Sequence, residues 1–176
     1  MADPQAQDAP ASAYDMGHDE VRDQRATFAV IVDNEPGVLH RVVGLFAGRG
    51  YNIESLTVAE TDHRAHTSRI TIVTSGTPAV LDQIRAQLDK TVCVRSIQDV
   101  TRDPLGVERE LALVRVERAG EAQEVARGLG ARSLSHGVFE LTGDSRTIDR
   151  FFQQMRPFGV AELSRTGVLS ITGGAD

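Results

Sequence analysis

The sequence predicts an α+β protein with two consecutive domains, each in the order strand, helix, strand, strand, helix, strand. Its length of 176 residues is enough for one large domain or two small ones. Apolar side chains alternate at strand spacing and recur at helical spacing in that order over residues 27–100, and the order then repeats. Residues 103–106, Asp-Pro-Leu-Gly, have the composition of a linker. We therefore expect domains at residues 25–103 and 104–176.

The first predicted strand, residues 27–32, leads into a predicted helix at residues 38–46. The strand is apolar throughout, which is typical of burial on both faces, and the helix has an apolar stripe. Between them, Pro36 suits the first helical position and Gly37 leaves the backbone open to a ligand. Free N–H groups of the first turn and the helix dipole would then form a small anion site that suits a carboxylate. Most such turns bind nothing, and Pro-Gly is also common turn chemistry.

The remaining elements complete the first domain. The first helix is expected to end near Gly48 or Gly50. Residues 51–59 are expected to be a strand with Tyr51, Ile53 and Ser55 on one face, followed by a polar hairpin connection at residues 60–67. A strand follows at residues 69–74, then a helix that opens on Thr77-Pro78, then a strand at residues 91–100. This order gives the ferredoxin-like split βαβ arrangement, with two helices on one face of a four-stranded antiparallel sheet.

The other face of that sheet would be bare. Its candidate residues are apolar: Ala29, Ile31, Val58 and Val73. An uncovered apolar sheet face is typical of a partner site, so we expect at least a dimer.

The second half contains a weaker copy of the first. We expect strands at residues 110–117, 132–134, 138–141, 160–164 and 168–171, and helices at residues 121–129 and 145–155. Gly76-Thr77-Pro78 and Gly143-Asp144-Ser145 each open a helix at an offset of 67 residues, and the apolar stripe of the helix recurs at the same offset. This pattern modestly favours an internal repeat.

Composition and charge exclude some functions. The formal net charge of −6 argues against a nucleic-acid or anionic-membrane surface as the main partner. Residues 1–25 carry six acidic side chains and two arginines, and residues 1–24 have no hydrophobic period, so we expect a disordered acidic tail there. The sequence has no stretch apolar enough for a membrane span and no signal peptide, and its single cysteine fits a reducing compartment, so we expect a cytoplasmic protein.

Reactive side chains are few. Cys93 lies in the apolar run 92–94, where a small core residue is a better interpretation than a nucleophile. His63 and His66 lie in the polar hairpin and are interpreted as solvated loop residues rather than metal ligands.

The sequence contains no catalytic motif. It has no dinucleotide-binding glycine motif with an acidic ribose ligand, no phosphate loop (Lys90 is the only lysine), no cysteine pair and no Ser-His-Asp set at suggestive positions. An acylphosphatase-like enzyme that uses Arg and Asn is the catalytic alternative on this fold. A single-stranded RNA binder would need exposed aromatics and a basic face, which this chain lacks. We therefore predict no catalytic residue, and no metal or cofactor bound by this chain.

Residues 34–39, Asn-Glu-Pro-Gly-Val-Leu, resemble an ACT domain, the amino-acid-sensing form of this fold. A longer match is more specific. Residues 41–46, 49–59, 68–73 and 107–114 resemble the small regulatory subunits of acetolactate synthase, also called acetohydroxyacid synthase. The resemblance covers residues 25–167 and is denser in the first half.

The resemblance implies an ACT domain at residues 25–103, a C-terminal ACT-like domain and a regulatory role. The partner would be the large catalytic subunit, which carries thiamine diphosphate, Mg²⁺ and FAD. This chain would activate that subunit and let valine, leucine or isoleucine inhibit it. The effector would lie where two ACT domains of a homodimer meet, held from one subunit by Asn34 and the backbone of Gly37, Val38 and Leu39, and from the neighbour by Asn52 and Ile53. A stand-alone ACT-type sensor that regulates another enzyme is the alternative.

The chemistry of these residues suits an amino acid. The helix N-terminus supplies donors for a carboxylate, and asparagine oxygens or a carbonyl accept from an ammonium group. An apolar pocket contributes about 0.8 kcal/mol per buried CH₂, which favours valine over alanine. A single methylene changes binding by only roughly 1–3 kcal/mol, so the choice among branched side chains stays open. The alternative role for Asn34 and Asn52 is turn chemistry.

Overall fold

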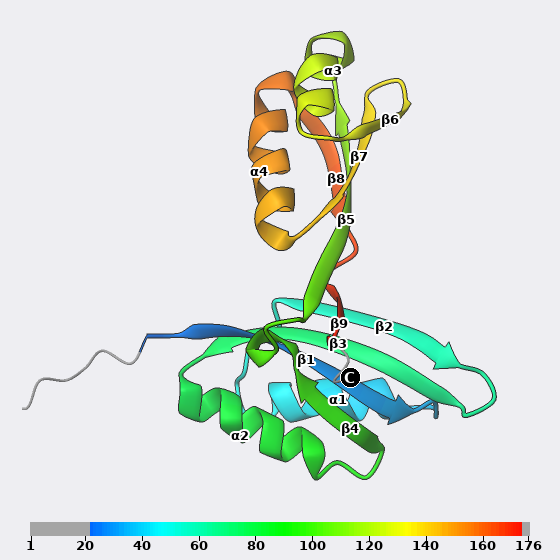
Figure 1. The fold of residues 1–176 in the computed structure, drawn as a ribbon, viewed down its shortest axis with the longest axis vertical. Helices are drawn as coiled ribbons and strands as arrows, with labels where there is room; N and C mark the ends of the chain where they lie inside the picture. Colours follow the sequence, from blue (N-terminus) through cyan, green and yellow to red (C-terminus); the bar gives the residue numbers. More distant parts are fainter. Residues whose placement is uncertain (1–21, 174–176) are drawn as a thin grey trace, which may run out of the picture.

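The computed structural model describes residues 22–173 (Figure 1). The expected tail, residues 1–24, falls outside the described residues except at its end, where the first strand begins. The first domain contains β1 (Gln24–Asp33), α1 (Val38–Ala47), β2 (Ser55–Asp62), β3 (Thr67–Gly76), α2 (Pro78–Asp89), β4 (Val94–Asp99) and the short 3₁₀ helix η1 (Val100–Arg102). The second contains β5 (Val107–Val116), α3 (Ala119–Gly128), β6 (Arg132–Ser135), β7 (Val138–Gly143), α4 (Ser145–Met155), the 3₁₀ helix η2 (Arg156–Phe158), β8 (Val160–Arg165) and β9 (Leu169–Ile171).

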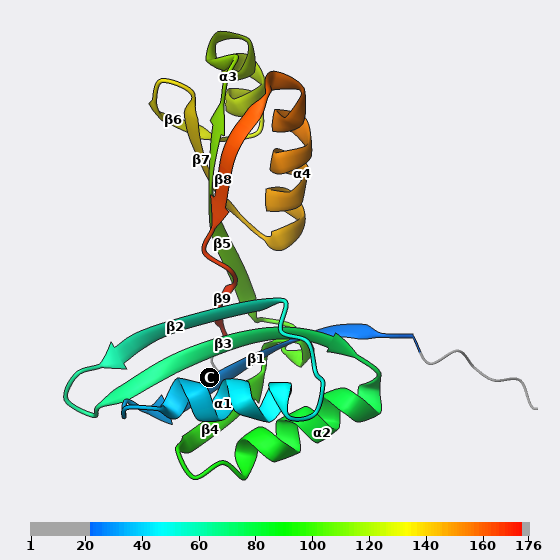
Figure 2. The ribbon, with the colours of Figure 1, turned by 180° about the vertical axis from the view of Figure 1, so that it is seen from behind.

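The two sheets have the same topology. The strand order is β2-β3-β1-β4 in the first and β6-β7-β5-β8 in the second, and all neighbours are antiparallel. In both views α1 and α2 lie on one face of the first sheet, and the second domain stands on the opposite side of that sheet (Figures 1 and 2). The prediction of an α+β chain with two ferredoxin-like units is confirmed.

Each domain has its own core. In the first, Phe28, Val30 and Val32 of β1 and Ile70 and Ile72 of β3 are buried against the apolar stripes of α1 and α2. In the second, alternate residues of β5 pack on a stripe of α4 that consists of Ile148, Phe151 and Met155. The two clusters share no residue. In each domain, side chains buried at strand spacing on the sheet pack on side chains buried at helical spacing. One layer of helices therefore covers one face of each sheet.

The helices α2 and α4 begin in the same way. The Thr77 hydroxyl accepts a hydrogen bond from the Val80 N–H at 3.4 Å, and the Asp144 carboxylate accepts one from the Thr147 N–H at 2.7 Å. These are N-caps, which satisfy donors that the helix itself leaves free. The offset of 67 residues found in the sequence therefore corresponds to two equivalent helices.

Three local expectations are wrong. Residues 51–54 are a loop and β2 starts at Ser55, so the expected inward face does not continue into the strand. Val58 pairs with Ile70 and shares its face, which is the helix side rather than the bare side. Cys93 is buried, as expected, but lies in the turn before β4 instead of a strand.

The face expected to be bare is partly covered by the chain itself. Residues 166–173 return from β8 and cross it, with β9 paired to the start of β5. The Val168 N–H donates to the Ser55 hydroxyl at 3.0 Å, and the Thr57 hydroxyl donates to the Thr166 carbonyl at 3.3 Å. As a result Ala29, Val73 and Val168 are buried without belonging to either main core. We call residues 166–173 the C-terminal strap.

Candidate functional site

The predicted ligand corner joins β1 to α1, but Pro36 does not occupy the first helical position as expected. Gly37 is the N-cap residue with φ of 85° and α1 starts at Val38, so Pro36 lies in the preceding turn and not at the first helical position. A positive φ explains the glycine: side chains with a Cβ rarely adopt that conformation. A Cβ added at Gly37 would meet nothing within 4 Å, so the glycine is required by the backbone and not by crowding.

The first turn of α1 leaves donors free. The Val38 N–H donates to the Glu35 carbonyl at 3.2 Å, and the Arg41 N–H begins the regular helical pattern by donating to Gly37. Within residues 22–173, the N–H groups of Leu39 and His40 have no protein acceptor. Two adjacent free donors at the positive end of a helix suit a carboxylate.

Neighbouring segments hold this corner in place. The Asn34 N–H donates to the His66 carbonyl at 2.8 Å, and the Asp33 N–H donates to the Cys93 carbonyl at 2.9 Å. Arg95 pairs with the Asp33 carboxylate at 2.6 Å. The hairpin interpreted from sequence as a solvated connection therefore supports the corner through its backbone.

The side chains of the corner divide into buried and open ones. Val38 is buried in the first core, whereas Leu39 is 39% exposed. The Asn34 side chain is exposed, and no partner for its amide occurs in the part of the chain that the structure describes. A free amide, two free N–H groups and an open leucine thus lie together in one short segment.

Asn52 and Ile53 lie elsewhere. The Asn52 carbonyl accepts a hydrogen bond from the Thr74 hydroxyl at 2.6 Å, near the end of β3, while Asn34 lies beside its start at Thr67. Seven residues of strand separate Thr67 from Thr74, which corresponds to about 23 Å. A free amino acid is far shorter than that, so one subunit alone does not bring the two predicted halves of the site together.

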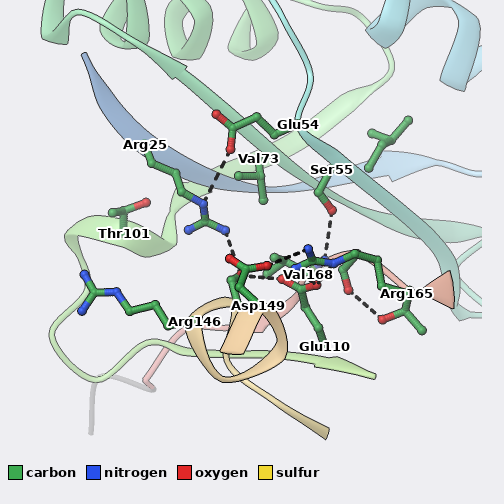
Figure 3. Close-up of a pocket in the computed structure, with 14 residues that line it drawn as sticks. Arg25, Glu54, Ser55, Val73, Thr101, Glu110, Arg146, Asp149, Arg165 and Val168 are labelled. Carbon is green, nitrogen blue, oxygen red and sulfur yellow. Dashed lines mark hydrogen bonds and ion pairs between the residues drawn. The ribbon is translucent and has the colours of Figure 1, made fainter. Parts of the chain in front are cut away.

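A second concave site was missed from the sequence. A cavity of about 740 Å³ lies between the two domains (Figure 3), and its lining residues come from positions 25 to 168. No local sequence motif predicts this cavity, because its lining residues come from both domains and from the strap. The nearest signal is Asp149, which lines the cavity and lies 67 residues after Asp82, at the offset of the internal repeat.

Most charged side chains in this cavity are paired. Glu110 on β5 is only 2% exposed and accepts hydrogen bonds from Arg165, at 2.7 Å, and from the Ser145 hydroxyl. Arg165 also pairs with Asp149 at 3.1 Å and lies over the Phe152 ring, 5.8 Å from its centroid. A buried carboxylate is tolerated only with such partners, so this cluster fixes the base of the second domain.

One charge on the first sheet is not paired. Arg69 on β3 shares its face with Ile31 and Ala59, and within residues 22–173 its buried Nε and Nη2 have no hydrogen-bond partner. Burial lowers the pKa of this guanidinium below its ordinary value. The part of the sheet face that the strap leaves uncovered is therefore not uniformly apolar, because it contains hydrogen-bond donors without acceptors among the described residues.

Two family models match this chain. One, described as an AHAS small subunit-like ACT domain, covers residues 28–96, and the other, described as the small subunit of acetolactate synthase, covers residues 109–174. The chain belongs to the acetolactate synthase small-subunit family. The resemblance inferred from residues 34–59 is thereby confirmed.

Curated and solved relatives agree on this small-subunit identity. The probable acetolactate synthase small subunit of Archaeoglobus fulgidus is 42% identical over 156 residues, which is 84% of this chain and 96% of that one. The isozyme 3 small subunit of Escherichia coli is 38% identical over 159 residues, covering 85% and 96% of the two chains. The crystal structure of the Thermotoga maritima small subunit has a TM-score of 0.75 at 30% identity and covers 87% of this chain and 99% of that one.

Membership in this small-subunit family decides between the classes of function considered above. The chain is a non-catalytic regulatory subunit, and a small subunit implies a large catalytic subunit as its partner. The acylphosphatase-like alternative has no support from the relatives. Residues 22–173 contain no cluster of three or more His, Cys, Asp or Glu side chains that could hold a metal ion. None of the helices in the described part combines the length and apolar character needed to cross a bilayer.

Proposed function

We propose that this chain activates the large catalytic subunit of acetolactate synthase and makes it sensitive to feedback inhibition by valine, leucine or isoleucine. Thiamine diphosphate, Mg²⁺ and FAD would be bound by that partner, which would carry out the chemistry in branched-chain amino acid biosynthesis in the cytoplasm. This chain would contribute no catalytic group and would act by shifting the population of active partner.

The observation that carries the proposal is the corner at the start of α1. The free N–H groups of Leu39 and His40 would take the effector carboxylate, beside the backbone of Gly37 and Val38. The Asn34 amide would take the ammonium group, and Leu39 offers apolar surface to the side chain.

The effector would be shared by two copies of the chain. Asn52 and Ile53 lie about 23 Å from the corner along β3, so within one subunit they cannot touch the same small ligand. A second ACT domain packed head to tail would bring its own Asn52 and Ile53 to the corner of the first. The proposal therefore requires a homodimer.

The decisive experiment mixes this chain with a large subunit and measures acetolactate formation with and without valine, leucine and isoleucine. We expect the chain to raise the activity and at least one of the three amino acids to lower it again. Activation without any effect of these amino acids would support the partner and refute the effector role.

Asn34→Ala separates the two roles. Since the Asn34 side chain is exposed at the corner and makes no hydrogen bond to any residue of the described range, the variant should still activate the large subunit. Loss of one charge-assisted hydrogen bond should raise the inhibitory valine concentration roughly tenfold. Asn52→Ala should act in the same direction from the other subunit. Unchanged valine sensitivity in both variants would exclude this site.

A further inference from the structure

The junction between the domains is loosely filled and lined by both charged and apolar side chains. The two apolar cores share no residue, and a cavity of about 740 Å³ separates them. The chain crosses between them only at residues 103–106 and in the strap after β8. Because the two cores share no residue, the relative position of the domains depends on the strap, whose Val168 is buried on the first sheet, and on a few directed polar contacts.

Arg25 makes the central contact of this junction. Its Nε lies 3.8 Å from the Glu54 carboxylate, at the end of the loop that contains Asn52 and Ile53. Its Nη1 donates to Glu108 on β5 at 3.2 Å, and its Nη2 donates to the Ser145 hydroxyl at the start of α4 at 3.4 Å. One planar guanidinium thus connects the loop at residues 51–54 with β5 and α4 of the second domain.

The polar chain continues into the second domain. The Ser145 hydroxyl accepts from Arg25 and donates to the buried Glu110, which in turn is held by Arg165. A parallel connection starts at the next residues of β2, where Ser55 and Thr57 bind the strap. Residues 52–57 therefore touch the proposed ligand at one end and the second domain at the other.

We propose that Arg25 is a positioning residue that couples residues 52–57 to the second domain. This inference rests on the proposed function, since it requires that an amino acid binds Asn52 and Ile53. Exposed ion pairs are individually weak, so the coupling depends on three contacts made at once by a rigid fork. Lysine keeps the charge but cannot make all three.

The test uses the full-length chain and hydrogen–deuterium exchange with and without saturating valine. In the wild type, we expect valine to change the exchange of residues 107–116 and 145–155. Arg25→Lys should bind valine within about twofold of the wild type in calorimetry, yet show an exchange response in these segments that is smaller by a factor of at least about two. A purely structural role would alter binding and response together. Arg115→Lys is the matched control and should respond like the wild type. Arg115 is an exposed arginine whose one ion pair among residues 22–173 is with Glu162, at 3.4 Å.

A second experiment tests the same coupling without an amino acid ligand. Glu54→Gln is compared in the wild-type and the Arg25→Lys background for its effect on exchange of residues 145–155. We expect Glu54→Gln to raise exchange there in the wild type and to have little further effect when Arg25 is already replaced, because the two residues act through one connection.

The outcomes separate the two proposals. If the wild type binds none of the three amino acids, the effector role fails and the Glu54 comparison alone decides the coupling. If valine binds and Arg25→Lys responds as strongly as Arg115→Lys, or if the Glu54 effect is equal in both backgrounds, the coupling is overturned while the effector role stands.

Discussion

At the scale of single residues, the proposed site depends on backbone conformation more than on side chains. Gly37 has a φ of 85° directly before α1, and the turn it makes leaves the N–H groups of Leu39 and His40 without an acceptor in residues 22–173. Gly44, in the middle of the same helix, has no such constraint and is exposed. The backbone conformation therefore requires glycine at position 37 but not at position 44.

A matched pair of substitutions tests this difference. Gly37→Ala should destabilise the fold by about 1 kcal/mol, because alanine is strained at positive φ. It should also weaken valine binding by tilting the free donors. Gly44→Ala should be neutral or stabilising by roughly 0.5–1 kcal/mol, since alanine is the better helix former and its Cβ meets nothing within 4 Å. Urea unfolding and calorimetry with valine measure both effects, and equal behaviour of the two variants would contradict the account.

At the scale of elements, the two equivalent helices α2 and α4 depend on different caps. Asp144 accepts from the Thr147 N–H at 2.7 Å, whereas Thr77 accepts from Val80 at 3.4 Å. The hydrogen bonds from the Thr147 side chain and backbone lower the pKa of the Asp144 carboxyl below 3.8. A charged acceptor at a helix N-terminus also interacts favourably with the helix dipole, so α4 has the stronger cap.

Removing the caps should reveal this order. Asp144→Ala should cost about 1 kcal/mol of unfolding free energy at neutral pH, and Thr77→Ala less. Because folding lowers the pKa of Asp144, its charge stabilises the folded state above the unfolded value near 3.8. That contribution is lost as the pH falls through the lower pKa of the folded state. Asp144→Asn keeps the cap but should lose this pH-dependent part of the stability. Thermal unfolding between pH 3 and pH 7 compares the three variants.

At the scale of the whole molecule, the C-terminal strap changes what the first sheet offers to partners. Val168 is 1% exposed against the sheet, while the next residue, Leu169, is 52% exposed on the other side of the strap. The sheet face that sequence alone would leave bare is thus partly used within the chain. The surface left for a second subunit is smaller than predicted, and it includes Arg69, whose Nε and Nη2 have no partner among the residues that the structure describes.

Adjacent substitutions in the strap test this arrangement. Val168→Ala should destabilise the protein by roughly 2 kcal/mol, because it removes buried methyl groups and leaves a cavity. It should also speed amide exchange in β2, since the strap protects Ser55 and Thr57. Leu169→Ala should change stability by less than about 0.5 kcal/mol, as expected for an exposed side chain. If both variants unfolded alike, the strap would not be docked in solution.

The sequence by itself determined most of the local elements, the doubled βαββαβ order, the position of the corner between β1 and α1, and the family. These depend on hydrophobic period, turn residues and motif spacing, which are all short-range properties of the chain. Only the tertiary structure decided which face Val58 occupies, where α1 begins relative to Pro36, and that Asn34 and Asn52 lie at opposite ends of one sheet. Strand register decides the first and last of these, and register follows from pairing between segments far apart in sequence. The cavity, the Arg25 junction and the strap were invisible for the same physical reason: each is made by residues from both halves of the chain, and no local pattern encodes a contact between distant segments.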